Sequence, residues 1–99
     1  MNIQAMMKQA QKLQKDMMNA KKQIDVMTFT SKKEFVEIVV SGDREVRSVK
    51  INKENLDGED IEMLEDLILV CVNDAMDQIE AVTEQKMGKF THGLPGLFY

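Results

Sequence analysis

A strict apolar seam in the first 27 residues constrains the fold more than any other feature of this chain. Apolar residues recur there at alternating spacings of three and four, and they are Ile3, Met6, Ala10, Leu13, Met17, Ala20, Ile24 and Met27. An average period of about 3.5 is that of the a and d positions of a heptad, and no Gly or Pro interrupts the stretch. The seam predicts a long N-terminal helix that packs against another helix rather than broadly against a sheet.

A stripe of amines runs along the opposite side of the same predicted helix. With Ile3 placed at a, the heptad puts Lys8, Lys15 and Lys22 at f, Lys12 at the neighbouring c, and Lys21 at e beside the seam. Successive f positions lie about 10.5 Å apart along a helix axis. Such a row suits a phosphate backbone, because each contact releases condensed counterions. The alternative is a solvated face that keeps the protein soluble, although such faces usually mix the signs of charge.

The charge of the chain is divided between its two parts. Residues 1–33 hold seven lysines and two acids, a net charge of +5, whereas the remaining residues hold six basic and fifteen acidic groups, a net charge of −9. This asymmetry predicts an electrostatic partner for the N-terminal part. One Cys permits neither an intrachain disulfide nor a four-thiolate zinc site. The longest apolar run, 67–72, is too short to span a bilayer, and we expect a small cytosolic protein with a radius of gyration near ~13 Å.

Three runs of β-branched and aromatic residues follow the first helix. They cover Val26–Ser31, Phe35–Ser41 and Val46–Asn52, with turn residues between them, and predict a three-stranded antiparallel meander. On the second strand Val36, Ile38 and Val40 share one face, and Phe35 and Val39 point to the other. On the third strand Val49 and Ile51 share a face. A central strand that is apolar on both faces needs two partners, one of which is expected to be another subunit.

A second long helix is predicted from Asp57, as N-cap, to about Met87, with Gly88 as C-cap. Its apolar stripe extends almost all round, which predicts burial on more than one side. Together with the second strand, this helix predicts a homodimer whose interface contains Phe35, Val39, Leu69 and Val72. Residues 90–99 hold Gly93, Pro95 and Gly96, and are predicted to form a flexible tail.

The sequence offers little chemistry. His92 stands alone near the C-terminus, and Cys71 lies on the apolar face of the second helix as a small core residue. Acids gather at the start of that helix, where its dipole favours them, without the spacing of a calcium loop. We therefore predict no catalytic residues, no metal, no cofactor and no membrane contact.

Five stretches resemble the YbaB/EbfC family of nucleoid-associated proteins: MKQAQKLQ at 7–14, VKIN at 49–52, EMLEDL at 62–67, VNDA at 72–75 and LPGLF at 94–98. The resemblance implies an α+β domain over residues 1–90, with the order helix, three strands, helix, followed by a tail at 91–99. It also implies a tweezer-shaped homodimer that binds double-stranded DNA with little sequence dependence in the bacterial cytoplasm, at the nucleoid. Effects on DNA conformation and gene expression would follow from that binding.

The chain departs from the family pattern at two places. The family usually has a Gly-rich loop between the first two strands, where this chain has the short segment 31–34, and Asp77, Glu80 and Glu84 make the second helix less basic. The predicted DNA contacts are Lys8, Lys12, Lys15 and Lys22, with Lys21, Lys86 and Lys89 as further candidates. The alternative is a coiled-coil adaptor whose Met-rich seam and acidic second helix bind another protein. DNA binding that weakens steeply with salt would favour the first hypothesis.

Overall fold

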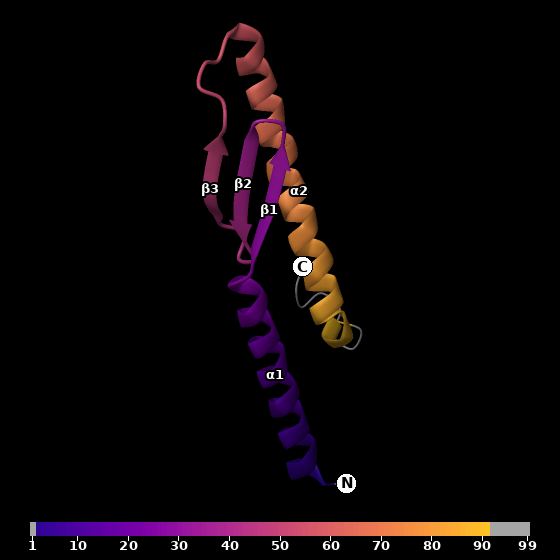
Figure 1. Ribbon diagram of the computed structural model, residues 1–99. Coiled ribbons are helices and arrows are strands. Elements are labelled where there is room, and N and C mark those ends of the chain that lie inside the picture. Colours follow the sequence, from indigo (N-terminus) through magenta and orange to yellow (C-terminus); the bar gives the residue numbers. More distant parts are fainter. Residues whose placement is uncertain (1, 92–99) are drawn as a thin grey trace.

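The computed structural model describes residues 2–91, which form an elongated α+β fold (Figure 1). The elements are α1 (Ile3–Asp25), β1 (Thr28–Lys33), β2 (Val36–Ser41), β3 (Val46–Ile51) and α2 (Gly58–Thr91). The molecule measures 72 × 20 × 14 Å and its radius of gyration is 19.4 Å, well above the value expected for a compact chain of this length. The excess arises because α1 projects away from the sheet instead of folding back over it.

The three strands form an antiparallel sheet in the order β1-β2-β3, as the sequence predicted. Helix α2 packs against β1 and β2 and covers the face that carries Val36, Ile38 and Val40, which are completely buried. Cys71 lies in this core, and its thiol approaches the carbonyl of Val36 at 3.9 Å, which confirms its predicted core position. Strand β3 lies at the edge of the sheet, and all six of its residues are exposed.

The first strand begins and ends two residues later than predicted, at Thr28 and Lys33 instead of Val26 and Ser31. Val26 is the C-cap of α1, Met27 follows it, and β1 begins at Thr28, so the last predicted seam residue lies outside the helix. Lys33 pairs with Val36, which leaves Glu34 and Phe35 as a two-residue turn, with Glu34 at φ 50°. Such tight turns need positive φ and match the twist of the strands they join. Phe35 is therefore a turn residue and does not belong to β2.

The open face of the sheet is more polar than predicted. The register places Thr30 and Ser48 beside Val39, and Lys32 and Lys50 beside Glu37. Val39 is half-buried among these polar neighbours. The apolar second face that the sequence indicated for β2 is thus reduced to this one side chain.

Helix α2 begins as predicted and ends later than predicted. The Asp57 carboxylate accepts a hydrogen bond from the Asp60 amide at 2.9 Å, and the Asp60 carboxylate accepts one from the Asp57 amide at 3.1 Å. Lys53 lies 2.7 Å from Asp60, and this bond lowers the pKa of Asp60 and raises that of Lys53. At the other end the C-cap prediction is wrong, because the helix continues through Gly88 to Thr91. Packing of Phe90 against α1 supports the extra turn in spite of the low helix propensity of glycine.

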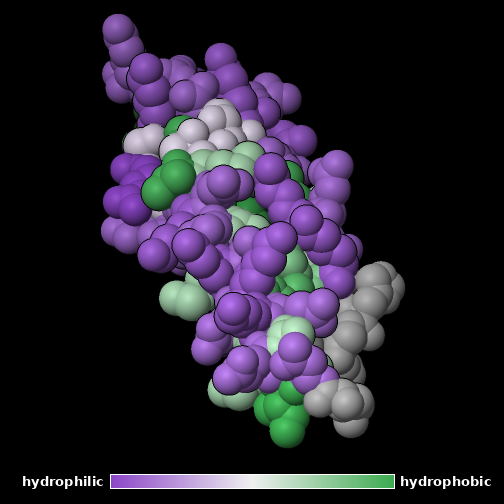
Figure 2. All heavy atoms as spheres, turned by 90° about the horizontal axis from the view of Figure 1, so that it is seen from below, coloured by the Kyte–Doolittle hydropathy of each residue, from purple (hydrophilic) through white to green (hydrophobic). Residues whose placement is uncertain are grey.

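Helix α1 contacts the rest of the chain near its C-terminal end. Met17 and Ile24 are buried in a small cluster with Met87 and Phe90 of α2, with Ala20 beside them. This confirms a helix–helix contact for the second half of the seam. Ile3, Met6 and Leu13 in the first half are exposed. Viewed from below, toward the free end of α1, the surface is mainly hydrophilic, with hydrophobic side chains in small separate groups (Figure 2).

Candidate nucleic-acid interface

The predicted lysine stripe runs along α1, from its projecting part to its last turn. The helix starts at Asn2, whose side-chain oxygen accepts a hydrogen bond from the Ala5 amide at 3.2 Å, and good helix formers fill the turns that follow. Lys8, Lys12, Lys15 and Lys22 are all exposed. Within residues 2–91 no ion pair engages any of these four ammonium groups. They are therefore available to an external anion.

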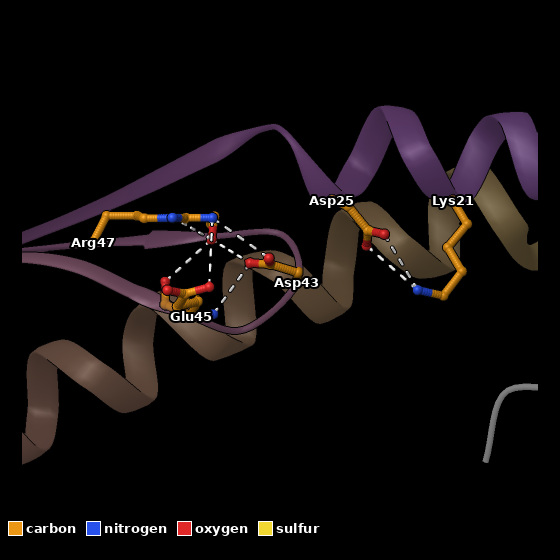
Figure 3. A network of polar contacts seen from close by, with 6 residues as sticks. Lys21, Asp25, Asp43, Glu45 and Arg47 are labelled. Carbon is orange, nitrogen blue, oxygen red and sulfur yellow. Dashed lines mark hydrogen bonds and ion pairs between the residues drawn. The ribbon is translucent and has the colours of Figure 1, made fainter.

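Lys21 differs from the four lysines of the stripe. Its ammonium group lies 3.4 Å from the carboxylate of Asp25, one turn further along α1 (Figure 3). Because this pair is solvent-exposed, it contributes little to stability. It does neutralise the positive charge of Lys21, which also lies on the seam side of the helix.

Amide side chains accompany the lysines, and the sequence prediction did not include them. Lys15 and Lys22 line a shallow hollow of about 340 Å³ on one side of α1, together with Gln11, Gln14, Met18 and Asn19. Glutamine and asparagine carry two N–H donors each and can hydrogen-bond phosphate oxygens beside the charged contacts. Gln11 and Asn19 occupy b and c positions, which flank f on the helix surface, and this is the signal by which the sequence could have identified them.

The structure does not bring Lys86 and Lys89 into the stripe. Both belong to the end of α2, where Met87 and Phe90 pack against the seam side of α1. The stripe lies on the opposite side of α1, so the two groups of lysines face different surfaces. Lys86 is exposed, and the ammonium group of Lys89 lies 5.0 Å from the centre of the Phe90 ring.

Two further cations lie near the end of α1: Arg44 in the turn between β2 and β3, and Arg47 at the start of β3. Arg47 donates a hydrogen bond to the Ser41 hydroxyl at 3.0 Å and lies within 3.6 Å of the carboxylates of Asp43 and Glu45 (Figure 3). The Ser41 hydroxyl donates to Asp43, and this bond lowers the pKa of Asp43. Arg44 occupies a left-handed conformation at φ 66°, and lines a hollow of about 150 Å³ with Lys21. Acids and bases balance here, so the turn adds no strong positive field.

The fold separates the two charge classes along the long axis. The lysine stripe runs along α1 from Lys8, near the free end, to Lys22 in the last turn, and the acids gathered before and within the first turns of α2 lie at the far end of the molecule (Figure 1). The projecting part of α1, which we call the basic arm, is thus remote from most of the negative charge of its own chain. A local positive potential is compatible with the acidic total.

Other kinds of site find no support in the part of the chain that the structure describes. No group of His, Cys, Asp and Glu side chains there could hold a metal ion. No helix between residues 2 and 91 has the length and apolar character that crossing a membrane requires. His92 and the rest of the predicted tail lie outside the described residues, whereas Phe90, which the sequence assigned to that tail, is buried in α2.

Among the described residues, α1 presents an exposed row of amines without ion pairs, and a row of this kind can contact an extended polyanion. In comparison with known proteins, the YbaB/EbfC DNA-binding family matches residues 1–94 of the chain. The chain belongs to this family of DNA-binding proteins. It is 53% identical to a nucleoid-associated protein of Lactococcus lactis subsp. cremoris over 96% of this chain and 98% of the relative. It is 40% identical to nucleoid-associated proteins of Ligilactobacillus salivarius and Enterococcus faecalis, again over nearly the full length of each.

Proposed function

We propose that this protein is a nucleoid-associated protein that binds duplex DNA through the lysines of α1, with little dependence on sequence. The observation that carries the proposal is the row formed by Lys8, Lys12, Lys15 and Lys22, which are exposed and make no ion pair with any residue between 2 and 91. Amines that reach phosphates position a protein on DNA without reading bases. The arm carries no arginine that could make bidentate contacts to guanine.

We infer that the protein acts as a homodimer that presents two such arms. Exposed apolar side chains support this, and they gather on β3 (Val46, Val49 and Ile51) and on the first half of α2 (Ile61, Met63, Leu69 and Val70). Gln78 of α2 bonds to the Thr30 carbonyl, which marks the flank of α2 toward β1. From the helical repeat, Leu69 and Val72 fall on the opposite flank of α2, which we infer is the side of the edge strand β3. A second copy would cover this surface.

Of the four predicted interface residues, Leu69 fits this arrangement best, with 61% of its surface exposed. Val72 is half-buried against the core beside it. Phe35 packs partly against the core beneath the ammonium group of Lys53, and Val39 lies on the polar open face. Phe35 and Val39 are therefore weaker candidates than the sequence indicated.

Replacing the four stripe lysines by glutamine tests the DNA-binding proposal. Glutamine has nearly the helix propensity of lysine, so the helical circular dichroism and the sedimentation coefficient should be unchanged. Affinity should fall on every duplex alike, and the slope of log affinity against log salt should shrink by about one for each lost phosphate contact. A folded quadruple variant that binds like the wild type would refute the stripe as the DNA site.

Four single variants refine the same experiment. Lys22→Gln should reduce the salt slope more than Lys21→Gln, because Asp25 already neutralises Lys21. Lys86→Gln and Lys89→Gln measure how much the separate surface at the end of α2 contributes to DNA affinity. If the wild type shows no salt-dependent binding to duplex DNA, the exposed first half of the seam favours the adaptor hypothesis instead.

A further inference from the structure

Gly42, in the turn between β2 and β3, lies with its backbone directly against the last turn of α1. A Cβ atom at this position would lie 1.8 Å from the carbonyl oxygen of Ile24 and 2.6 Å from its carbonyl carbon. Both are backbone atoms at the C-terminal end of α1, so no side-chain rotation could relieve the overlap. Positive φ in this turn falls on Arg44 and not on Gly42. Glycine is required at position 42 for space rather than for backbone freedom.

Hydrogen bonds fasten the turn to the junction between α1 and β1. The Gly42 amide donates to the Met27 carbonyl at 2.9 Å, and the Met27 amide donates to the Ile24 carbonyl at 3.0 Å. The turn is itself held by bonds between Ser41 and Glu45 and by the side chains around Arg47 (Figure 3). The turn between β2 and β3, held by its own hydrogen bonds, thus packs directly against the last turn of α1.

We propose that this contact sets the direction of α1 relative to the sheet, so that Gly42 aims the arm that carries the lysine stripe. The proposal rests on the proposed function only for its effect on DNA. It makes Gly42 a positioning residue, since its backbone lies at the end of α1 and the stripe extends toward the other end.

Helix geometry gives the size of the effect. Moving a methyl group from 1.8 Å to an ordinary contact distance of 3.4 Å displaces the Ile24 end of α1 by about 1.6 Å. The packing of Met17 on α2 acts as a fulcrum about 10.5 Å away along the axis, and Ile3 lies about 21 Å beyond it. The free end of the arm therefore moves about 3 Å.

The test compares Gly42→Ala with Gly58→Ala, which adds the same methyl group where no atom lies within 4 Å. Spin labels on Gln4→Cys and Glu80→Cys, or on Gln4→Cys and Ser48→Cys, report distances from the arm to α2 and to β3. All three positions are exposed, whereas Cys71 is fully buried. Labelled protein is diluted into unlabelled protein so that distances within one chain are measured.

We expect Gly42→Ala to move the distance by about 3 Å in at least one label pair, and to lower DNA affinity and the salt slope, without loss of helical circular dichroism. Gly58→Ala should change none of these. Unchanged distances would overturn the proposal whether or not the chain binds DNA. A moved arm that binds DNA with unchanged affinity and salt slope would overturn the role of its direction in binding.

If Gly42→Ala does not fold, Arg47→Gln gives an independent test. This exposed substitution removes the charge that links Asp43 and Glu45, and so loosens the turn without entering the core. We expect a broader distribution of the same distances in the absence of DNA. A distribution as narrow as that of the wild type would show that the turn does not hold the arm.

Discussion

Both helices of this protein carry apolar residues at helical spacing, a narrow seam on α1 and a broad stripe on α2, and the two helices bury them to different extents. Helix α2 buries Cys71, Ala75 and Ile79 against the sheet, and these side chains are at most 1% exposed. Helix α1 buries Met17 and Ile24, and leaves Ile3 69% exposed. One helix therefore forms the core, and the other forms an arm. A periodic stripe establishes that a segment is helical, whereas the topology decides how much of that stripe finds a partner.

An isoleucine-to-alanine substitution on each helix should give the largest difference between the two, measured as the free energy of unfolding. Ile79→Ala removes a buried side chain from the core and should lower the free energy of unfolding by about 2–5 kcal/mol. Ile3→Ala removes an exposed one and should change that free energy by less than about 0.5 kcal/mol. Urea denaturation followed by circular dichroism measures both. Equal losses would mean that the first half of the seam is covered in solution.

Most of the fold could be predicted from local patterns. The heptad spacing located α1, alternation located β2 and β3, and Asp57 with Asp60 located the start of α2. The errors fell where tertiary contacts outweigh local preference. Lys32 and Lys33 extend β1 because their side chains can stay in solvent, and the helix passes Gly88 because Phe90 packs against α1.

The proposed dimer surface provides the second test. Leu69→Asp places a charge on the exposed flank of α2, where a second copy would leave it buried and unpaired. The monomer should stay folded, and dimer affinity should fall about a hundredfold or more, as measured by sedimentation velocity over a range of concentrations.

Leu13→Asp is the matched control, because it introduces the same charge at an exposed leucine on α1. It should leave the sedimentation behaviour unchanged. Dissociation by Leu13→Asp but not by Leu69→Asp would place the interface on the arm and contradict the proposed arrangement. A wild-type protein that is monomeric at micromolar concentration would contradict the dimer itself.

The smallest expected effect concerns the end of α2. Gly88 lies inside the helix, with open space around the position of a Cβ atom, so Gly88→Ala should raise the free energy of unfolding by up to about 1 kcal/mol. At a left-handed C-cap the same change would be destabilising. Thermal unfolding distinguishes the two, and a lower midpoint would show that α2 ends at Gly88 in solution.

The candidate site was less predictable than the fold. Heptad positions placed Lys8, Lys15 and Lys22 on one exposed row, and set Lys21 apart from it. The sequence could not show that Lys86 and Lys89 lie across α1 from that row, because this depends on which side of α1 meets α2. The close approach of Gly42 to Ile24 joins residues far apart in the chain, and its spacing leaves no periodic signal.

The separation of charge along a 72 Å molecule has a consequence for how it approaches DNA. Opposite poles make the chain an electric dipole, and the field of a duplex exerts a torque on a dipole as well as a pull on its positive pole. The screening length at physiological salt is about 8 Å, far shorter than the molecule, so each pole senses the duplex separately. On the proposed function, a chain that arrives with its acidic pole first is repelled, and one that arrives with the lysine stripe first is attracted. Salt therefore changes the fraction of collisions that succeed, in addition to the strength of the contacts that follow.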